Sequence, residues 1–172
     1  ITKIVNKLLT KKYINQLVHS ALLEDIGREG DITSKVLIPK SSLSKATIVV
    51  KEKAVICGTE FAKQTFKKLD KSVKIRTLKK DGELANKGDK IITISGKTQN
   101  ILTAERTALN FLGLMSGVAS KARKFSYIAD PYGSKIYSTR KTIPGIRKLE
   151  KYALTIGGAY INRETLDDFF FI

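Results

Sequence analysis

The segment KIYSTRKTIPGIRKLEKYALTIGG, residues 135–158, decides the fold of the second half of the chain. Its first five residues are rich in β-branched and aromatic side chains, which predicts a short strand from Lys135 to Thr139. Pro144 suits the first turn of a helix, and Gly157 and Gly158 predict where that helix ends. A strand followed at once by a helix is typical of parallel α/β architecture. The helix is expected to bury Ile146, Leu149, Ala153 and Ile156.

The residues that follow the predicted strand are candidates for an anion-binding site. Arg140 and Lys141 come directly after it, and active-site residues of α/β folds gather at the carboxyl ends of parallel strands. A guanidinium group offers a planar fork for carboxylate or phosphate oxygens, and a lysine adds a compact positive charge. The alternative is an ordinary pair of surface cations. Arg106 and Arg163 pose the same choice between an anion ligand and the partner of an acidic side chain.

The residues on either side of this segment extend the alternation of helix and strand. Apolar residues recur at helical intervals from residue 99 to 129, which predicts one helix, or two divided near Ser116 and Gly117. The apolar run from Phe169 to Ile172 predicts the next strand. Because the run has no cap, turn or polar tail, we expect the protein to continue beyond it.

The first half of the chain predicts an α+β domain. Apolar residues from Ile4 to Leu22 mark one long amphipathic helix that ends near Gly27. Residues 24–39 are interpreted as an irregular connection whose acidic side chains serve as caps and turn residues. A later helix, with Thr59 as its N-cap, is expected to place Phe61, Ala62, Thr65, Phe66 and Leu69 on one face.

Short β-branched runs in this half suggest a small sheet around that helix. Residues 81–96 are similar to the hairpins of lipoyl and biotinyl carrier domains, but they lack the lysine-centred tripeptide that bears the cofactor there. We therefore expect a structural hairpin. The predicted strands are residues 46–51, 54–58, 73–78 and 90–95.

Composition excludes several classes of function. The formal charge of +16 favours a phosphate binder, but the lysines are scattered and form no basic block, so nucleic-acid binding is not favoured. Cys57 has no partner for a disulfide, and with one histidine, His19, no Cys/His metal cluster can form. His19 is interpreted as a structural or exposed side chain rather than a general base. No apolar stretch approaches the roughly 20 residues that span a bilayer and no charged-then-apolar leader opens the chain, so a soluble, non-secreted protein is expected. The lone cysteine fits a cytoplasmic location.

Over nearly its whole length the chain resembles the quinolinate phosphoribosyltransferase family. EDIGREGDIT with VLIP (24–39) is similar to the family's early segment, and TAERTALNFL (103–112) to its domain-junction helix. STRKTIPGIRKLEKYAL (138–154) and GGAYINRETLDDFFFI (157–172) are similar to its first barrel motifs. The resemblance implies an α+β N-terminal domain over residues 1–104, and over residues 105–172 the start of a parallel α/β barrel that is truncated here.

The resemblance also implies an activity. Phosphoribose would pass from phosphoribosyl pyrophosphate, accompanied by Mg²⁺, to quinolinate, and decarboxylation would give nicotinate mononucleotide. Arg106 would enter the partner subunit's site in a homodimer, and Lys141 would contact the charged groups of the substrates. No metal ligand is expected in this segment. The implied ligands of the substrate carboxylates are Thr139, Arg140 and Arg163.

One position departs from the family pattern. Asn162 stands where the family usually has a histidine before the arginine. Asparagine can hydrogen-bond a carboxylate but cannot become cationic. Two other functions therefore stay open: a pyrophosphorylase-like paralogue of the same fold, such as the proteins associated with molybdenum transport, acting on another acceptor; and a basic nucleic-acid-binding module.

Overall fold

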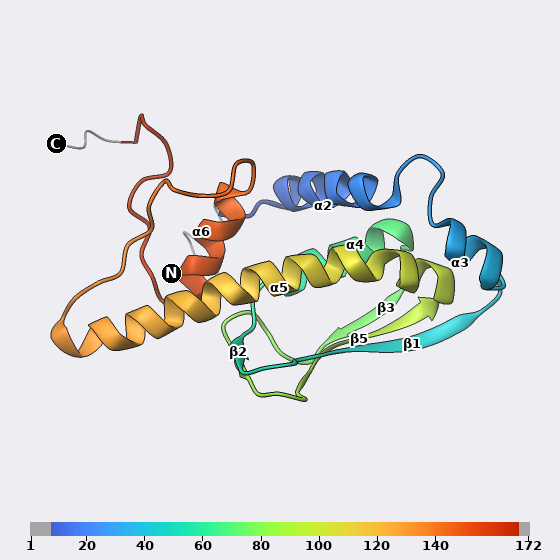
Figure 1. The fold of residues 1–172 in the computed structure, drawn as a ribbon, viewed down its shortest axis with the longest axis horizontal. Coiled ribbons are helices and arrows are strands. Elements are labelled where there is room, and N and C mark those ends of the chain that lie inside the picture. Colours follow the sequence, from blue (N-terminus) through green and yellow to red (C-terminus); the bar gives the residue numbers. More distant parts are fainter. Residues whose placement is uncertain (1–7, 169–172) are drawn as a thin grey trace.

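The computed structural model describes residues 8–168, and Figure 1 shows their arrangement. The first complete helix, α2, runs from Lys11 to Ile26 and ends at Gly27, which has a φ of 64°. The hydroxyl of Thr10 accepts a hydrogen bond from the Tyr13 amide at 3.2 Å and so caps the helix. A single helix was expected from Ile4 onward, and that expectation is wrong, because Thr10 is the N-cap of a helix that begins only at Lys11. The part before residue 8 lies outside the described residues.

The connection after α2 contains a helix that the sequence pattern did not predict. Helix α3 spans Ile32–Leu37, and its N-cap Asp31 accepts a hydrogen bond from the Ser34 amide at 2.9 Å. Asp31 also accepts one from the Thr103 hydroxyl at 2.8 Å. The hydrogen bonds from Ser34 hold the pKa of Asp31 below its usual value. The capping role expected for the acidic residues is thus confirmed for Asp31, whereas Asp25 lies within α2 and accepts from the Thr107 hydroxyl at 3.0 Å. The expectation of a wholly irregular connection is wrong.

The described strands form two small antiparallel sheets. One has the order β1 (Leu43–Val49), β5 (Lys90–Lys97), β3 (Lys74–Thr77), and the other pairs β2 (Ala54–Val55) with β4 (Leu84–Ala85). A strand is present at each of the four expected places, but β2 contains only the first two of the expected residues 54–58. The expected hairpin over residues 81–96 is wrong, because β4 pairs with β2 whereas β5 pairs with β1 and β3.

Two helices cover one face of the larger sheet. Helix α4 (Thr59–Leu69) lies beside α5 (Thr98–Ala129), which crosses above the strands (Figure 1). Helix α5 is a single helix of 32 residues, which decides between the two predictions for this stretch. The N-cap of α4 is Gly58, with a φ of 98°, rather than the expected Thr59. The core between helices and sheet includes Ile56, Ala62, Phe66, Ile92, Ile94, Ala104 and Ala108.

A second core joins the N-terminal helices to the end of the described chain. Helix α6 (Arg147–Ile156) begins later than expected, because Pro144 and Gly145 form a turn and Ile146 is the N-cap. Two of the four expected core residues of α6, Leu149 and Ala153, are completely buried, while Ile146 and Ile156 pack at the edge. This core also contains Val18, Leu22, Phe61, Phe111 and Met115.

The residues on either side of α6 form a parallel bridge. Tyr137 pairs with Tyr160, the Ser138 amide donates to the Tyr160 carbonyl at 2.8 Å, and the Tyr160 amide donates to the Ile136 carbonyl at 2.8 Å. The expected strand from Lys135 to Thr139 is therefore wrong in its length, because only Tyr137 makes a bridge. The order of a bridge residue, a helix and a parallel partner still agrees with the expected start of an α/β unit. The expected strand at Phe169 to Ile172 lies outside the described residues and stays a prediction.

The close approach of α6 to α5 depends on a glycine. A Cβ added at Gly157 would lie 2.5 Å from the Ala122 Cβ and 3.0 Å from the Arg123 backbone nitrogen. We expect Gly157→Ala to lower the free energy of unfolding by about 1–3 kcal/mol, because overpacking forces the two helices apart. Urea denaturation measures the change.

The matched control for this substitution is Gly117→Ala within α5. No atom lies within 4 Å of a Cβ added there, so alanine is expected to stabilise the helix by roughly 0.5–1 kcal/mol. Equal effects of the two substitutions would contradict the packing argument.

Candidate active site

The predicted anion-binding loop folds back on the first turn of α6. The Lys141 amide donates to the Thr139 hydroxyl at 3.1 Å, and the Thr142 amide donates to the Arg140 carbonyl at 3.0 Å. The Glu150 carboxylate accepts from the Ile143 amide at 3.3 Å. These bonds give the loop a defined backbone without using the charged ends of Arg140 and Lys141.

Arg140 and Lys141 differ in their surroundings. Lys141 is exposed, whereas Arg140 is half-buried and its Nε is a buried donor with no hydrogen-bond partner among the described residues. A buried N–H group without a partner is costly, and a native structure usually supplies one. A bound anion would satisfy this donor.

The second part of the site is the segment after Tyr160. The Asn162 amide lies 3.4 Å from the hydroxyl of the buried Ser138 and donates to it. Because Ser138 immediately precedes Thr139, this contact brings the backbone of Asn162 and Arg163 next to the start of the loop that contains Arg140 and Lys141. The Asn162 side chain is exposed. Five of the six expected site residues therefore gather at one end of the parallel bridge.

Arg106 is the expected site residue that this part of the chain does not bring into the group. It is exposed on α5 and lies 13 residues before Ala119, near which α6 packs. At 1.5 Å per residue that separation is about 20 Å along the helix. A role for Arg106 in the same pocket would need a second subunit.

Two cations on α6 belong to the same neighbourhood, although the sequence pattern did not select them. Lys151 has 0% of its surface exposed, and its Nζ donates to the Arg163 carbonyl. Arg147, one turn earlier, donates from Nη1 to the Glu164 carbonyl at 2.9 Å and from Nε to the Thr142 hydroxyl at 3.1 Å. Their i, i+4 spacing puts them on one helix face, but that spacing does not show which face a later segment will cover.

The electrostatics of Lys151 reflect this crowding of charge. Burial lowers the pKa of Lys151, while the nearby carboxylate of Glu164 raises it. Arg147 and Arg140 lower it further, and Asp168 raises it. Asp168 also organises its own segment, because it accepts hydrogen bonds from the amides of Glu164 at 2.5 Å and Thr165 at 3.1 Å.

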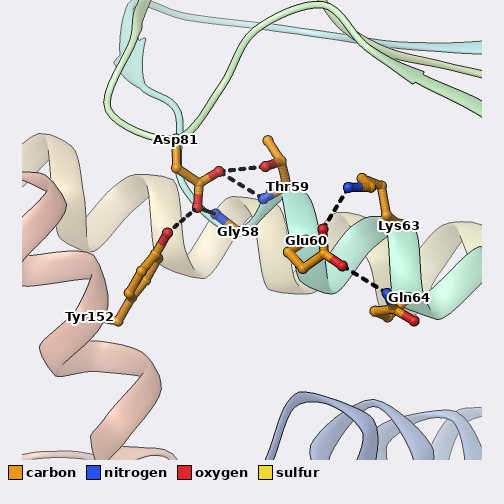
Figure 2. Close-up of polar contacts among 7 residues, drawn as sticks. All are labelled: Gly58, Thr59, Glu60, Lys63, Gln64, Asp81 and Tyr152. Atoms are coloured by element: carbon orange, nitrogen blue, oxygen red, sulfur yellow. Dashed lines mark hydrogen bonds and ion pairs between the residues drawn. The ribbon is translucent and has the colours of Figure 1, made fainter. Parts of the chain in front are cut away.

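A carboxylate far away in the sequence holds α6 against the N-terminal half of the chain (Figure 2). Asp81 Oδ2 accepts from the Tyr152 hydroxyl and from the Gly58 amide, each at 2.9 Å. Asp81 Oδ1 accepts from the Thr59 amide at 3.0 Å and its hydroxyl at 2.6 Å. Asp81 therefore caps α4 and anchors α6 with one side chain. Burial and the Asp81 charge raise the pKa of Tyr152, which keeps its hydroxyl a donor.

The chemistry that this arrangement supports is anion binding. Cys57 is completely buried, and burial raises the pKa of its thiol, so it is no activated nucleophile. The described residues contain no group of three or more His, Cys, Asp or Glu side chains able to hold a metal ion. None of the described helices is both long and apolar enough to cross a membrane. The positive groups near one end of the parallel bridge are the distinctive feature.

Comparisons with known proteins identify the family. Residues 31–116 match the model for the quinolinate phosphoribosyl transferase N-terminal domain, and residues 118–172 match the model for its C-terminal domain. A probable nicotinate-nucleotide pyrophosphorylase of Bacillus subtilis is 38% identical over 164 residues, which cover 95% of this chain and 55% of that protein. A chloroplastic nicotinate-nucleotide pyrophosphorylase of rice is 36% identical, over 90% of this chain and 41% of that protein.

Solved structures agree with this assignment. The nicotinate-nucleotide pyrophosphorylase of Francisella tularensis superimposes with a TM-score of 0.89 at 35% identity, over 95% of this chain and 57% of that one. The chain thus spans about half the length of the relatives that it matches. Two adjacent domain models of one family match in their proper order, the first over residues 31–116 and the second over residues 118–172. The chain therefore belongs to the quinolinate phosphoribosyltransferase family.

Proposed function

We propose that the complete protein transfers phosphoribose from phosphoribosyl pyrophosphate to quinolinate, with release of pyrophosphate and carbon dioxide, to give nicotinate mononucleotide for NAD biosynthesis. The observation that carries the proposal is the buried Arg140 Nε, which has no partner among the described residues and lies in a loop beside Lys141 and Asn162. A dicarboxylate and a pyrophosphate that meet in one pocket need several cations. Each charge-assisted hydrogen bond contributes about 1.5–3 kcal/mol.

The reaction requires mainly that the protein position the two substrates and stabilise their charges electrostatically. The ring nitrogen of quinolinate attacks the anomeric carbon of the ribose while the bond from that carbon to the pyrophosphate oxygen breaks, through an oxocarbenium-like state. The carboxylate next to the ring nitrogen is then lost as carbon dioxide, and a proton takes its place. In this proposal Thr139, Arg140, Asn162 and Arg163 hold the carboxylates, and Lys141 contacts the charged groups of both substrates.

Mg²⁺ accompanies phosphoribosyl pyrophosphate in this proposal, where it would neutralise part of the pyrophosphate charge. We assign none of its ligands to the described residues. The chain would act as a homodimer in which the exposed Arg106 of one subunit reaches the other subunit's pocket, within a closed α/β barrel. Exposure of Arg106 on α5, away from the other site residues, supports that arrangement. We place the protein in the cytoplasm, which suits its lone, reduced cysteine.

The direct test is turnover by the complete protein. Incubation with quinolinate, phosphoribosyl pyrophosphate and Mg²⁺ is expected to release pyrophosphate and nicotinate mononucleotide in equal amounts, measured by chromatography. Absence of product at every Mg²⁺ concentration would reject the activity. Tight, steeply salt-dependent binding to generic duplex DNA in its place would favour a nucleic-acid-binding function.

A second candidate rests on Asn162. Its exposed amide stands where the family resemblance implies a histidine, so the acceptor could be a different ring acid bound by the same fold. We expect Asn162→His to change the affinity for quinolinate, measured by calorimetry, by less than about tenfold if quinolinate is the natural acceptor, since a single hydrogen bond contributes about 1 kcal/mol. A gain of a hundredfold would favour the paralogue.

A further inference from the structure

Lys151 is the buried cation of α6 that the proposed chemistry does not use directly. It has 0% of its surface exposed, and its Nζ donates to the carbonyl of Arg163. Lysine is almost never fully buried unless it is paired, because removing its charge from water is costly. A fully buried lysine that binds a backbone carbonyl next to a proposed site therefore needs an explanation.

The elements around Lys151 all carry charge. Arg147 precedes it by one turn of α6, Arg140 approaches from the anion-binding loop, and Glu164 and Asp168 face it from the segment after Tyr160. The two carboxylates offset part of the repulsion between the cations. The ammonium group is thus held within a mixed cluster, not beside a single salt-bridge partner.

The contacts of α6 converge on one short stretch of backbone. Lys151 holds the Arg163 carbonyl, and Arg147 holds the next carbonyl, that of Glu164, at 2.9 Å. On the other side, the Asn162 amide donates to the Ser138 hydroxyl. Three consecutive residues, 162–164, are therefore anchored through their backbones. The anchored backbone in turn fixes the positions from which their side chains extend.

We infer that Lys151 is a positioning residue: by holding the Arg163 carbonyl it fixes the backbone from which Asn162 and Arg163 reach the carboxylates of the acceptor. The inference rests on the proposed function for the identity of the acceptor. It assigns Lys151 no contact with substrate. Displacement of binding groups by about 1 Å can cost on the order of a hundredfold in rate, so a residue of this kind has a measurable effect.

A positioning role and a purely structural role of Lys151 predict different effects of its replacement on the stability of the fold. Lys151→Met leaves the Arg163 carbonyl without its donor, which is unfavourable, but it also removes the desolvation cost of a buried ammonium group, and the two effects oppose each other. The midpoint of thermal unfolding is therefore expected to change only modestly. The effect of Lys151→Met should appear instead in the order of residues 162–164 and in acceptor binding.

Three variants of the complete protein test the inference: Lys151→Met, Lys151→Gln and the control Lys148→Met. Lys148 is exposed on the same helix, so its loss removes the same charge without touching the Arg163 carbonyl. Lys151→Gln keeps a donor but not the charge. Hydrogen exchange of residues 160–168, followed by mass spectrometry, reports the anchoring without any substrate. Calorimetry with quinolinate, and KM for each substrate, report its consequence.

For Lys151→Met we expect faster exchange in residues 160–168 and about tenfold to a hundredfold weaker quinolinate binding. KM for phosphoribosyl pyrophosphate should stay within about threefold, and Lys151→Gln should recover part of the affinity because it restores a donor. Lys148→Met should match the unsubstituted protein. Unchanged exchange in Lys151→Met, or an equal loss for both substrates together with a large fall in thermal stability, would overturn the inference.

The exchange measurement separates this inference from the proposed function. If the unsubstituted protein fails to bind quinolinate, the proposed acceptor is wrong, yet a local increase of exchange in Lys151→Met would still support the anchoring. If the unsubstituted protein turns over quinolinate and Lys151→Met does so equally well, the proposed function stands and the positioning role fails.

Discussion

Arg140→Ala in the complete protein is expected to lower kcat/KM for quinolinate at least about 30-fold. Removing one member of a desolvated charge pair typically costs ~2–5 kcal/mol, and each 1.36 kcal/mol is a factor of ten in rate. The buried Arg140 Nε has no partner among the described residues, so the substitution should cost little stability. Steady-state kinetics, together with urea denaturation of the same variant, measure the two effects separately.

Two further variants sharpen this result. Arg140→Lys keeps the charge but loses the planar fork, so its kcat/KM should fall between that of alanine and that of the unsubstituted protein. Arg76→Ala removes an exposed arginine from β3 and serves as the matched control, with kcat/KM unchanged. A loss of less than threefold in Arg140→Ala would remove Arg140 from the site.

Asp81→Ala is expected to lower the free energy of unfolding by about 3 kcal/mol. The carboxylate accepts hydrogen bonds from Tyr152 of α6 and from Gly58 and Thr59 at the start of α4 (Figure 2). Loss of a helix cap costs about 0.5–2 kcal/mol, and each buried donor left unpaired costs about 1–3 kcal/mol. Urea denaturation monitored by circular dichroism measures the sum.

The contribution of α6 can be isolated with Tyr152→Phe. This variant removes the hydroxyl but keeps the ring, so it should cost about 1 kcal/mol, and a double-mutant cycle with Asp81→Ala should show coupling of at least about 0.5 kcal/mol. Glu52→Ala, at an exposed carboxylate, is the control and should change stability by less than about 0.5 kcal/mol. Additive effects of Asp81 and Tyr152 would contradict the proposed anchor.

Local patterns in the sequence predicted those features whose causes lie within a few residues of one another. Apolar spacing placed Leu149 and Ala153 in the core, and the two glycines marked the end of α6. The acidic residues between α2 and α3 were assigned to capping, as Asp31 demonstrates. The same patterns failed where a local signal was weak: the Thr10 cap and the short helix α3 went unnoticed.

The candidate site also contains residues that the sequence could select and residues that only the structure revealed. The position of Arg140 and Lys141 after a β-branched run was sufficient to select them, because strand ends in α/β folds are defined locally. Lys151 was not selected, since nothing in a helix of mixed charge says which lysine will be covered by a segment 12 residues later. Arg163 was selected, but its anchoring by α6 emerges only from the packed structure.

The sequence by itself therefore determined the family, the main helices and strands, and the group of cations after residue 138. Only the tertiary structure decided that β4 pairs with β2 rather than with β5 and that Asp81 bonds both the start of α4 and Tyr152, which lies 71 residues away in the sequence. It also decided that Lys151 is buried and bound to the Arg163 carbonyl. The physical reason is the separation in sequence over which each kind of interaction acts. Caps, turns and periodicity act over three or four residues, whereas strand pairing and the burial of polar groups depend on which distant segments fill the remaining space.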